Sequence, residues 1–148
     1  MVVASVHSHM SLERTEMTER LLAAIENPYT QIIAHPTGRL ILQRDPFDYD
    51  MERVFKAAAK YGVAMECNAY PDRLDLNDVH LRMAKQCGVK IVISTDSHRT
   101  SHLAFMKYGV QTARRGWIEK ANVLNTLPLR DLLSILRPKP RSTRAKVA

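Results

Sequence analysis

The chain has 148 residues, 45% of them hydrophobic, which is enough to build the packed core of one domain. Its 22 Lys and Arg residues outnumber 15 Asp and Glu residues, and the net charge of +7 suits a polyanionic partner without identifying one. The apolar runs are far shorter than the roughly 18 residues that cross a bilayer, and no secretion signal is visible. We therefore expect no membrane contact.

Four short apolar runs predict buried strands, because each is too short for a helix and three are rich in β-branched residues. They cover residues 2–6, 31–34, 63–67 and 89–95. Two cysteines, Cys67 and Cys87, lie in apolar stretches of the chain. We expect both to be buried, reduced thiols, which favours a cytoplasmic protein.

Helical patterns separate these runs. Met17, Leu21 and Ile25 follow one another at intervals of four residues, which indicates one face of a helix. Asp50 and Asn77 are typical N-caps of two further helices, after which Gly62 and Gly88 are typical C-terminal residues. Because strand and helix alternate, the sequence predicts an α/β fold with about four parallel strands in one sheet.

After residue 100 the pattern is helical, with short segments predicted at 101–108 and 118–124 and a last helix at 128–136. Tyr108 and Trp117 are expected in the core or at its rim. Residues 138–148 are rich in Lys, Arg and Pro, and we expect a basic, disordered tail there.

Polar side chains follow each predicted strand. The carboxyl ends of parallel strands share one edge of a sheet, where such folds place their chemistry, so these side chains should converge. Three histidines and an aspartate among them are of the types that bind Zn²⁺ or Mn²⁺. The polar side chains at the four strand ends are His7, His35, Glu66, Asn68, Asp96 and His98.

Any one of these histidines alone would more often be a hydrogen-bonded structural residue than a ligand. His9 is a weaker candidate, because the His7-Ser8-His9 spacing opens many metallohydrolase sites but would also arise from a polar rim residue. His80 and His102 lie in predicted helices, where a surface position is the expectation.

Several strings of the chain, taken in order, resemble the polymerase and histidinol phosphatase (PHP) domain of bacterial family X DNA polymerases. The resemblance runs from about residue 2 to about residue 136, and the combination is far more specific than any single string. The strings are VASVHSH at 3–9, AHPTGR at 34–39, ECNA at 66–69, RLDL at 73–76, STDSH at 94–98, YGV at 108–110 and ARRGW at 113–117.

The resemblance implies that residues 1–137 form the C-terminal half of a distorted seven-stranded β/α barrel, with up to three divalent ions, Zn²⁺ or Mn²⁺, in an intact domain. It implies that His7, His35, Asp96 and His98 are metal ligands, and that Asp96 and His98 are catalytic. Glu66, Asn68 and His9 stay possible members of the site.

Arg39 and Arg73 are candidates to hold a phosphate, because guanidinium matches phosphate oxygens in a bidentate way. A structural salt bridge of Arg73 with Asp72 or Asp75 is the alternative.

The activity that the resemblance implies is hydrolysis of phosphate esters at the 3′ end of DNA, as a 3′→5′ exonuclease or 3′-phosphatase. The family's opening H-x-H motif and a later glutamate ligand have no counterpart here. One rival is therefore an inactive half-domain with a structural or DNA-holding role, which would leave two open sheet edges and associate with itself or with the missing N-terminal half. Another rival is a different PHP phosphatase, such as a histidinol phosphatase.

Overall fold

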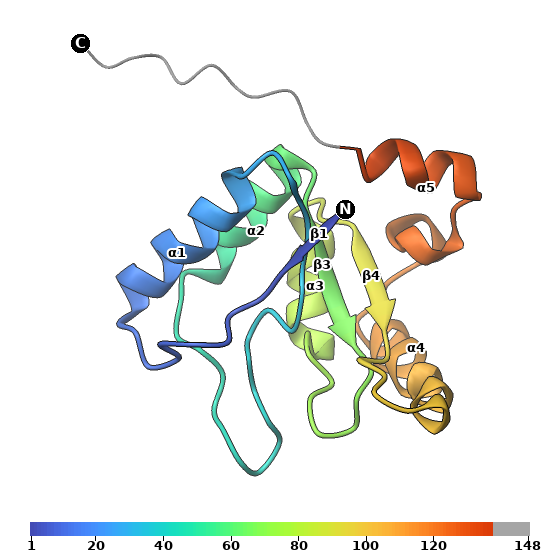
Figure 1. Cartoon of the computed structure of the whole chain (residues 1–148), viewed down its shortest axis with the longest axis horizontal. Coiled ribbons are helices and arrows are strands. Elements are labelled where there is room, and N and C mark those ends of the chain that lie inside the picture. Colours follow the sequence, from blue (N-terminus) through green and yellow to red (C-terminus); the bar gives the residue numbers. More distant parts are fainter. Residues whose placement is uncertain (138–148) are drawn as a thin grey trace.

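The computed structural model describes residues 1–137 and contains one parallel sheet (Figure 1). The tail predicted at 138–148 lies outside the described residues. The strands are β1 (Val2–Ala4), β2 (Thr30–Ile33), β3 (Ala64–Asn68) and β4 (Ile91–Ser94), paired in that order. All three pairings are parallel. The α/β class with four parallel strands, as in part of a β/α barrel, is therefore confirmed.

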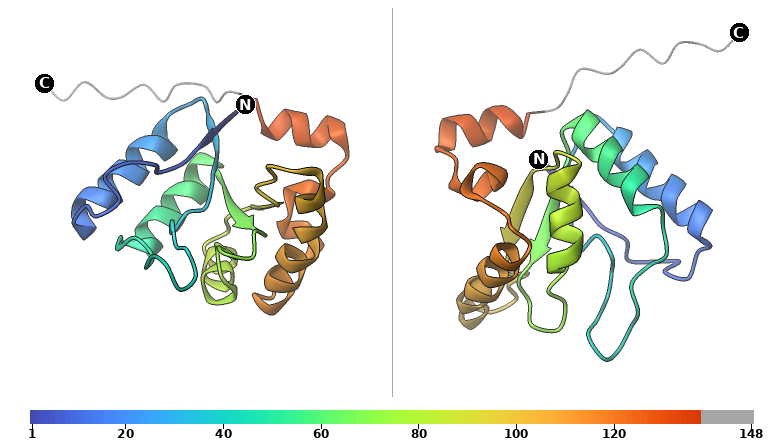
Figure 2. Two further views of the ribbon diagram at one scale, coloured as in Figure 1. Left: turned by 60° about the horizontal axis from the view of Figure 1, so that its bottom comes forward. Right: turned by 180° about the vertical axis from the view of Figure 1, so that it is seen from behind.

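The helices that follow the strands cover one face of this sheet. They are α1 (Arg14–Glu26), α2 (Met51–Tyr61), α3 (Asp78–Gln86) and α4 (Met106–Arg115). Seen from behind in Figure 2, α2 and α3 lie in front of the strands, with α1 beside α2. No helix among residues 1–137 is both long and apolar enough to span a membrane.

Local signals set the helix ends as the sequence predicts. Asp50 accepts a hydrogen bond from the backbone N–H of Arg53 at 3.0 Å, and Asn77 accepts one from His80 at 2.8 Å. Gly62 ends α2 in the left-handed conformation, with φ of 59°. The two N-caps fix where α2 and α3 start. Gly62 fixes where α2 ends, two residues before β3 begins at Ala64.

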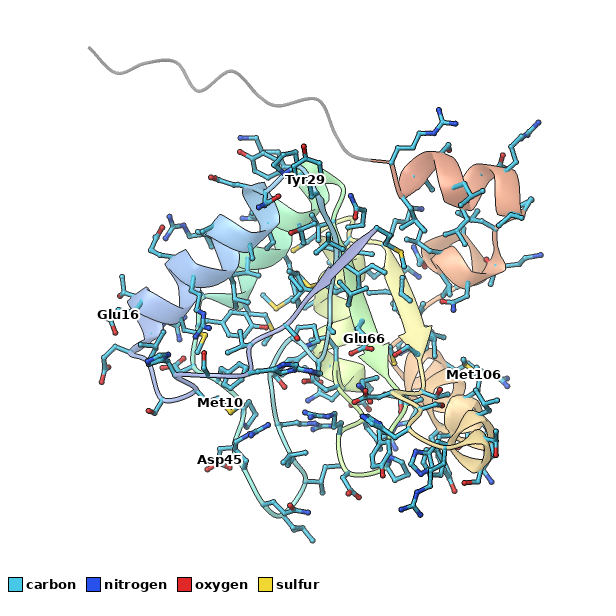
Figure 3. The ribbon with its side chains drawn as sticks, viewed as in Figure 1. Met10, Glu16, Tyr29, Asp45, Glu66 and Met106 are labelled. Carbon is cyan, nitrogen blue, oxygen red and sulfur yellow. The ribbon has the colours of Figure 1, made fainter. Side chains whose placement is uncertain are left out.

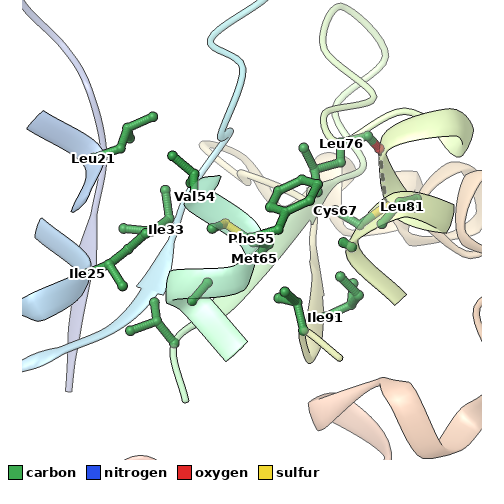
Figure 4. Packing of buried hydrophobic residues seen from close by; sticks show 14 of the residues in the cluster. Leu21, Ile25, Ile33, Val54, Phe55, Met65, Cys67, Leu76, Leu81 and Ile91 are labelled. Carbon is green, nitrogen blue, oxygen red and sulfur yellow. Dashed lines mark hydrogen bonds between the residues drawn. The ribbon is translucent and has the colours of Figure 1, made fainter. Parts of the chain in front are cut away.

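The main core lies between the helices and the sheet (Figure 4). Met17, Leu21 and Ile25 of α1 are buried in it, as their spacing predicts. Cys67 is buried there and burial raises the pKa of its thiol to about 12, whereas Cys87 is only partly buried. Both thiols are free. The larger members that Figure 4 labels are Leu21, Ile25, Ile33, Val54, Phe55, Met65, Cys67, Leu76, Leu81 and Ile91.

A smaller cluster covers the amino-terminal part of the opposite sheet face. Ile32 and Ala64 contact Leu124 of the 3₁₀ turn η3 (Leu124–Thr126), and Leu132 of α5 (Leu129–Ile135) packs against them. The side chain of Asn125 accepts a hydrogen bond from Ile93 N at 2.8 Å and donates to Ile93 O at 3.0 Å. The edge of β4 is thus occupied.

The expectation of two open edges is therefore wrong for β4, because Asn125 takes the place of a neighbouring strand. β1 forms the other edge of the described sheet. Val2 and Val3 of β1 are 44% and 48% exposed.

The region after residue 100 differs most from the sequence prediction. A 3₁₀ turn, η1 (Thr100–Phe105), continues into α4, which extends to Arg115. In place of the helical segment predicted at 118–124, only short 3₁₀ turns follow, η2 (Lys120–Asn122) and η3, whereas the last predicted helix is present as α5. The sequence predicts a segment that ends at Tyr108, because Gly109 follows and glycine is a poor helix former. A Cβ at Gly109 would lie 2.6 Å from Ile93 Cγ2 and 2.7 Å from Ala69 Cβ, so glycine lets α4 approach the sheet.

Trp117 is 71% exposed, so its expected place in the core is wrong, while Tyr108 is half-buried as a rim residue. Trp117 follows the end of α4 with a left-handed φ of 59°. Its backbone carbonyl accepts a hydrogen bond from Lys85 Nζ at 2.7 Å, and the backbone rather than the ring anchors this turn.

We expect Gly109→Ala to destabilise the chain by about 1–3 kcal/mol, because the added methyl group overpacks the contact between α4 and the sheet. Val110→Ala is the matched control, since Val110 is exposed on the same helix and alanine favours helix. Urea unfolding followed by circular dichroism measures both. Equal midpoints for the two variants would show that the α4 contact tolerates a Cβ.

Candidate functional site

Two of the predicted ligands meet at the carboxyl edge of the sheet. His7 follows β1 and His35 follows β2, and their Nε2 atoms lie 3.3 Å apart. The rings are stacked, with centroids 5.3 Å apart. Ser5 Oγ lies 3.1 Å from the same nitrogen of His7. The convergence that the topology predicts is therefore realised for this pair.

His35 is held in an environment that keeps its ring neutral. The residue is 7% exposed and has a left-handed φ of 30°, a conformation that costs energy for a side chain with a Cβ. Burial, and next the charge of the Arg73 guanidinium, lower the pKa of His35. A neutral imidazole is the form that binds a metal ion.

Asp96 lies on the other side of the edge, after β4. Its carboxylate accepts a hydrogen bond from Asn68 Nδ2 at 3.2 Å and lies 3.5 Å from Arg73 Nε. The salt bridge of Arg73 is thus with Asp96, and the alternative partners Asp72 and Asp75 are wrong. Asp96 also has a left-handed φ of 50°. Its side chain is 34% exposed, so an oxygen can reach a ligand.

His98 is exposed and oriented by its own backbone. Its Nδ1 lies 2.8 Å from the carbonyl oxygen of Asp96. Because a carbonyl only accepts, Nδ1 carries the proton and Nε2 keeps its lone pair, which is the usual arrangement in a metal-binding histidine. Within residues 1–137, His9 is exposed and has no hydrogen bond to this group.

Glu66, labelled in Figure 3, connects the ends of three strands through its hydrogen bonds. It is buried, and its carboxylate accepts hydrogen bonds from the backbone N–H of His35, the Ser94 hydroxyl and Asn68 Nδ2. Burial raises the pKa of Glu66, while these three hydrogen bonds oppose the rise. With its lone pairs engaged in this way, Glu66 supports the site from below.

Asp75 is a structural residue that sequence reasoning considered only as a partner of Arg73. Its fully buried carboxyl group accepts from Thr37 N at 3.0 Å and Gly38 N at 2.9 Å, and so holds the turn that carries His35. Burial raises the pKa of Asp75 to about 6, against the hydrogen bonds of Thr37. The signal available in the sequence was its position two residues after Arg73, within RLDL.

The two predicted phosphate-binding arginines differ. Arg39 Nε and Nη2 each donate at 2.6 Å, to the carbonyl oxygens of Arg73 and Leu74. Arg39 therefore positions the loop that carries Arg73. Arg73 Nη1 is buried and has no acceptor among the described residues. Because Arg39 uses its donors on the backbone while Arg73 keeps one unpaired donor, Arg73 is the better phosphate candidate.

The donor set fits part of a metal centre. Two nitrogens bound to one tetrahedral Zn²⁺ at ~2.0–2.1 Å would lie about 3.4 Å apart, which matches the separation of 3.3 Å between His7 and His35. Within the part of the chain that the structure describes, however, no group of three or more His, Cys, Asp or Glu side chains surrounds a common point. Asp96 and His98 lie at the same edge, but they do not join His7 and His35 in a group of three or more ligands around one point.

Glu66→Ala should destabilise the chain by roughly 2–5 kcal/mol, because the His35 N–H loses its acceptor in a buried place and a cavity remains. Glu66→Gln is the isosteric control. Its amide oxygen can accept from His35 while its amide group donates to Ser94, so the loss should be about 1 kcal/mol or less. Chemical unfolding at pH 7 compares them, and equal stability of the two variants would contradict this account.

The raised pKa of Asp75 predicts a pH dependence of stability. Its protonated form is favoured by folding, so its contribution is fully present below the unfolded pKa of 3.8 and is lost as pH rises through about 6. The loss amounts to roughly 3 kcal/mol at 1.36 kcal/mol per pKa unit. Asp75→Asn, which cannot ionise, should remove this part of the profile. Urea midpoints of both proteins at pH 4.5 and 7.5 test it, and parallel profiles would refute it.

Comparison with known proteins agrees with this architecture. No family model matches the chain. It is 43% identical to the DNA polymerase/3'-5' exonuclease PolX of Bacillus subtilis over 136 residues, which are 92% of this chain and 24% of that protein. It is 28% identical to a probable phosphatase of Thermoanaerobacter sp. over 84% of this chain and 52% of the relative.

A third relative is a probable phosphatase of Acetivibrio thermocellus, with 33% identity over 66% of this chain and 41% of the relative. The chain thus spans between a quarter and about half of the length of these proteins. The matches cover from 66% to 92% of this chain. Together they support a phosphoesterase module of the PHP type.

Proposed function

We propose that the chain is a metal-dependent phosphoesterase module that acts on the 3′ end of DNA, as a 3′→5′ exonuclease or 3′-phosphatase. The observation that carries the proposal is the separation of 3.3 Å between His7 Nε2 and His35 Nε2, at the edge that also carries Asp96 and His98. The exonuclease activity in the name of the Bacillus subtilis relative supports the exonuclease assignment.

In this proposal His7 and His35 hold one divalent ion, Zn²⁺ or Mn²⁺, and Asp96 and His98 supply further ligands. The full centre of an intact domain would hold up to three ions. When bound, the metal would lower the pKa of a water molecule toward neutrality and offset charge on the phosphate. Glu66 keeps the ligand-bearing turn of His35 in place.

The protein groups divide the remaining tasks. Asp96, partly exposed and fixed by Asn68, orients the attacking water and takes up its proton. The Arg73 guanidinium neutralises charge on a phosphate oxygen, and Arg39 holds the Arg73 loop. His98 presents Nε2 toward a ligand, since the Asp96 carbonyl fixes its tautomer.

Two alternatives stay open. In the first, the chain is an inactive half-domain that holds DNA or serves as a structural piece, which the incomplete ligand group favours. The exposed edge strand β1 would then pair with a second copy or with a segment that completes the barrel. In the second, the substrate is a small phosphate ester such as histidinol phosphate, which the probable phosphatases among the relatives favour.

The two free thiols support a cytoplasmic location as part of the proposal.

Hydrolysis of a 3′-recessed duplex, with either a 3′-hydroxyl or a 3′-phosphate, tests the proposal in Mn²⁺ and in Zn²⁺. Asp96→Asn should lower kcat at least about 100-fold, the usual contribution of a proton-transfer group. His98→Gln should lower kcat by about 10–100-fold or more, because it removes an imidazole that would hold the metal. Asp72→Asn is the charge-matched control, because Asp72 is exposed and its side chain contacts none of the site residues.

Calorimetric titration with Zn²⁺ separates the alternatives. Binding that His7→Gln abolishes, without turnover of any ester, would establish the half-domain. Faster turnover of histidinol phosphate than of DNA would establish the small-molecule phosphatase. Retention of DNA hydrolysis in Asp96→Asn would sink the proposal itself.

A further inference from the structure

Four aromatic rings gather beside the strand edge, and the mechanism above does not use them. Tyr70 meets His102 and Phe105 edge-to-face, each with centroids 5.3 Å apart. His102 stacks on Phe105 at 5.1 Å, and Tyr108 lies 6.1 Å from Phe105. We call these four residues the aromatic platform. It joins the loop after β3 to η1 and α4.

The aromatic platform is tied to the site through the backbone. The N–H of His98 donates to His102 Nδ1 at 3.3 Å, and the N–H of Tyr70 donates to the Asn68 side chain at 2.9 Å. The N–H of Arg73 donates to the Tyr70 carbonyl at 2.8 Å. Each contact partner, His98, Asn68 or Arg73, belongs to the candidate site. The rings therefore stand at a fixed place relative to the proposed phosphate position.

The platform is also accessible and lies in a basic stretch. All four rings are only partly buried, and Leu103, next to them in η1, is 63% exposed. Residues 97–118 contain four basic side chains and no Asp or Glu. Arg115 among them is paired with Asp78, whereas no ion pair involves Arg99 or Lys107 among the described residues. Lys107 Nζ lies 4.9 Å from the centroid of the Tyr108 ring. Aromatic faces next to cations suit a nucleobase joined to a phosphate.

We infer that the aromatic platform stacks the base of the terminal nucleotide while its phosphate lies at the strand edge. The inference rests on the proposed function and narrows its substrate class to nucleotides with an unpaired terminal base. Stacking is tolerant of base identity, since every base has a π face. It would separate a nucleic acid end from a base-free ester such as histidinol phosphate, which the metal ligands alone cannot do.

A simpler role for the rings is to pack η1 onto the loop after β3. Both roles predict some loss of stability when a ring is removed. Only stacking predicts that the ring contributes to the preference for a terminus with a base over one without. The decisive readout is therefore a ratio of affinities for two ligands and not an affinity or a stability alone.

The test uses the full chain and two fluorescein-labelled single-stranded oligonucleotides with a 3′-phosphate. One ends in a normal nucleotide and the other in an abasic sugar. Fluorescence anisotropy is read in Ca²⁺ after Mn²⁺ and Zn²⁺ have been removed, so that a divalent cation accompanies the phosphate while the ions proposed to support hydrolysis are absent. The unchanged protein should bind the first about tenfold more tightly or better. Phe105→Leu and Tyr70→Leu should reduce that ratio to near one, while Phe105→Tyr and Tyr70→Phe should keep it.

Tyr29→Leu is the matched control, because Tyr29 is 54% exposed and lies at the opposite end of the sheet from Met106 of α4 (Figure 3). Circular dichroism checks that each variant folds. Equal affinity of the unchanged protein for both oligonucleotides would overturn the inference, and so would an unaltered ratio in folded Phe105→Leu.

The outcome is independent of the proposed hydrolysis. A chain that prefers the normal terminus but cleaves nothing would retain the platform and lose the phosphoesterase. A chain that hydrolyses normal and abasic termini with equal kcat/KM in Mn²⁺ would keep the phosphoesterase and lose the platform.

Discussion

The buried carboxylate of Glu66 is the interaction on which the rest of the site depends. It accepts hydrogen bonds from groups at the ends of β2, β3 and β4: the His35 N–H, Asn68 and Ser94. A buried N–H without an acceptor costs about 1–3 kcal/mol. The main chain turns away from the sheet at His35 and needs a side-chain acceptor there. Glu66 supplies this acceptor and thereby sets the position of the His35 imidazole.

The other strand ends are fixed by similar means. The Asp75 carboxyl group holds the turn after His35 through Thr37 and Gly38, and Asn68 links Glu66 to the Asp96 carboxylate. His35 and Asp96 both have left-handed φ values, of 30° and 50°. Such conformations persist only where neighbouring contacts determine them, and they cluster at functional sites. Here the contacts that compensate the strain are those of Glu66, Asp75 and Asn68.

The sequence predicts those features of the fold that depend on neighbours along the chain. All four strands begin and end within a few residues of the expected limits, because apolar runs and N-caps such as Asp50 act locally. Parallel order then brings the strand ends together. The predicted helical segment ends at Tyr108, before Gly109, because glycine is a poor helix former, whereas α4 continues to Arg115. Glycine is needed there because a Cβ would clash with Ile93 and Ala69, which are distant in sequence.

Site residues followed the same division. Their common edge was predictable from topology, whereas their partners were not. The pairing of Arg73 with Asp96, the use of Arg39 to hold a loop, and the three acceptor roles of Glu66 all arise between residues far apart in the chain. Hydrogen-bond directions of this kind need coordinates. The roles of individual polar residues are therefore less predictable than their location.

The charge balance at the edge has a further consequence for what can bind there. Asp96 and Arg73 form an ion pair and cancel, and burial together with Arg73 keeps His35 neutral. A divalent cation alone, or a phosphate dianion alone, would leave uncompensated charge in a partly buried place, which is costly. Taken up together, the two charges cancel each other. Under the proposed function, this charge balance would favour coupled binding of the metal ion and the phosphate ester, with Asp96 facing the cation and Arg73 the anion.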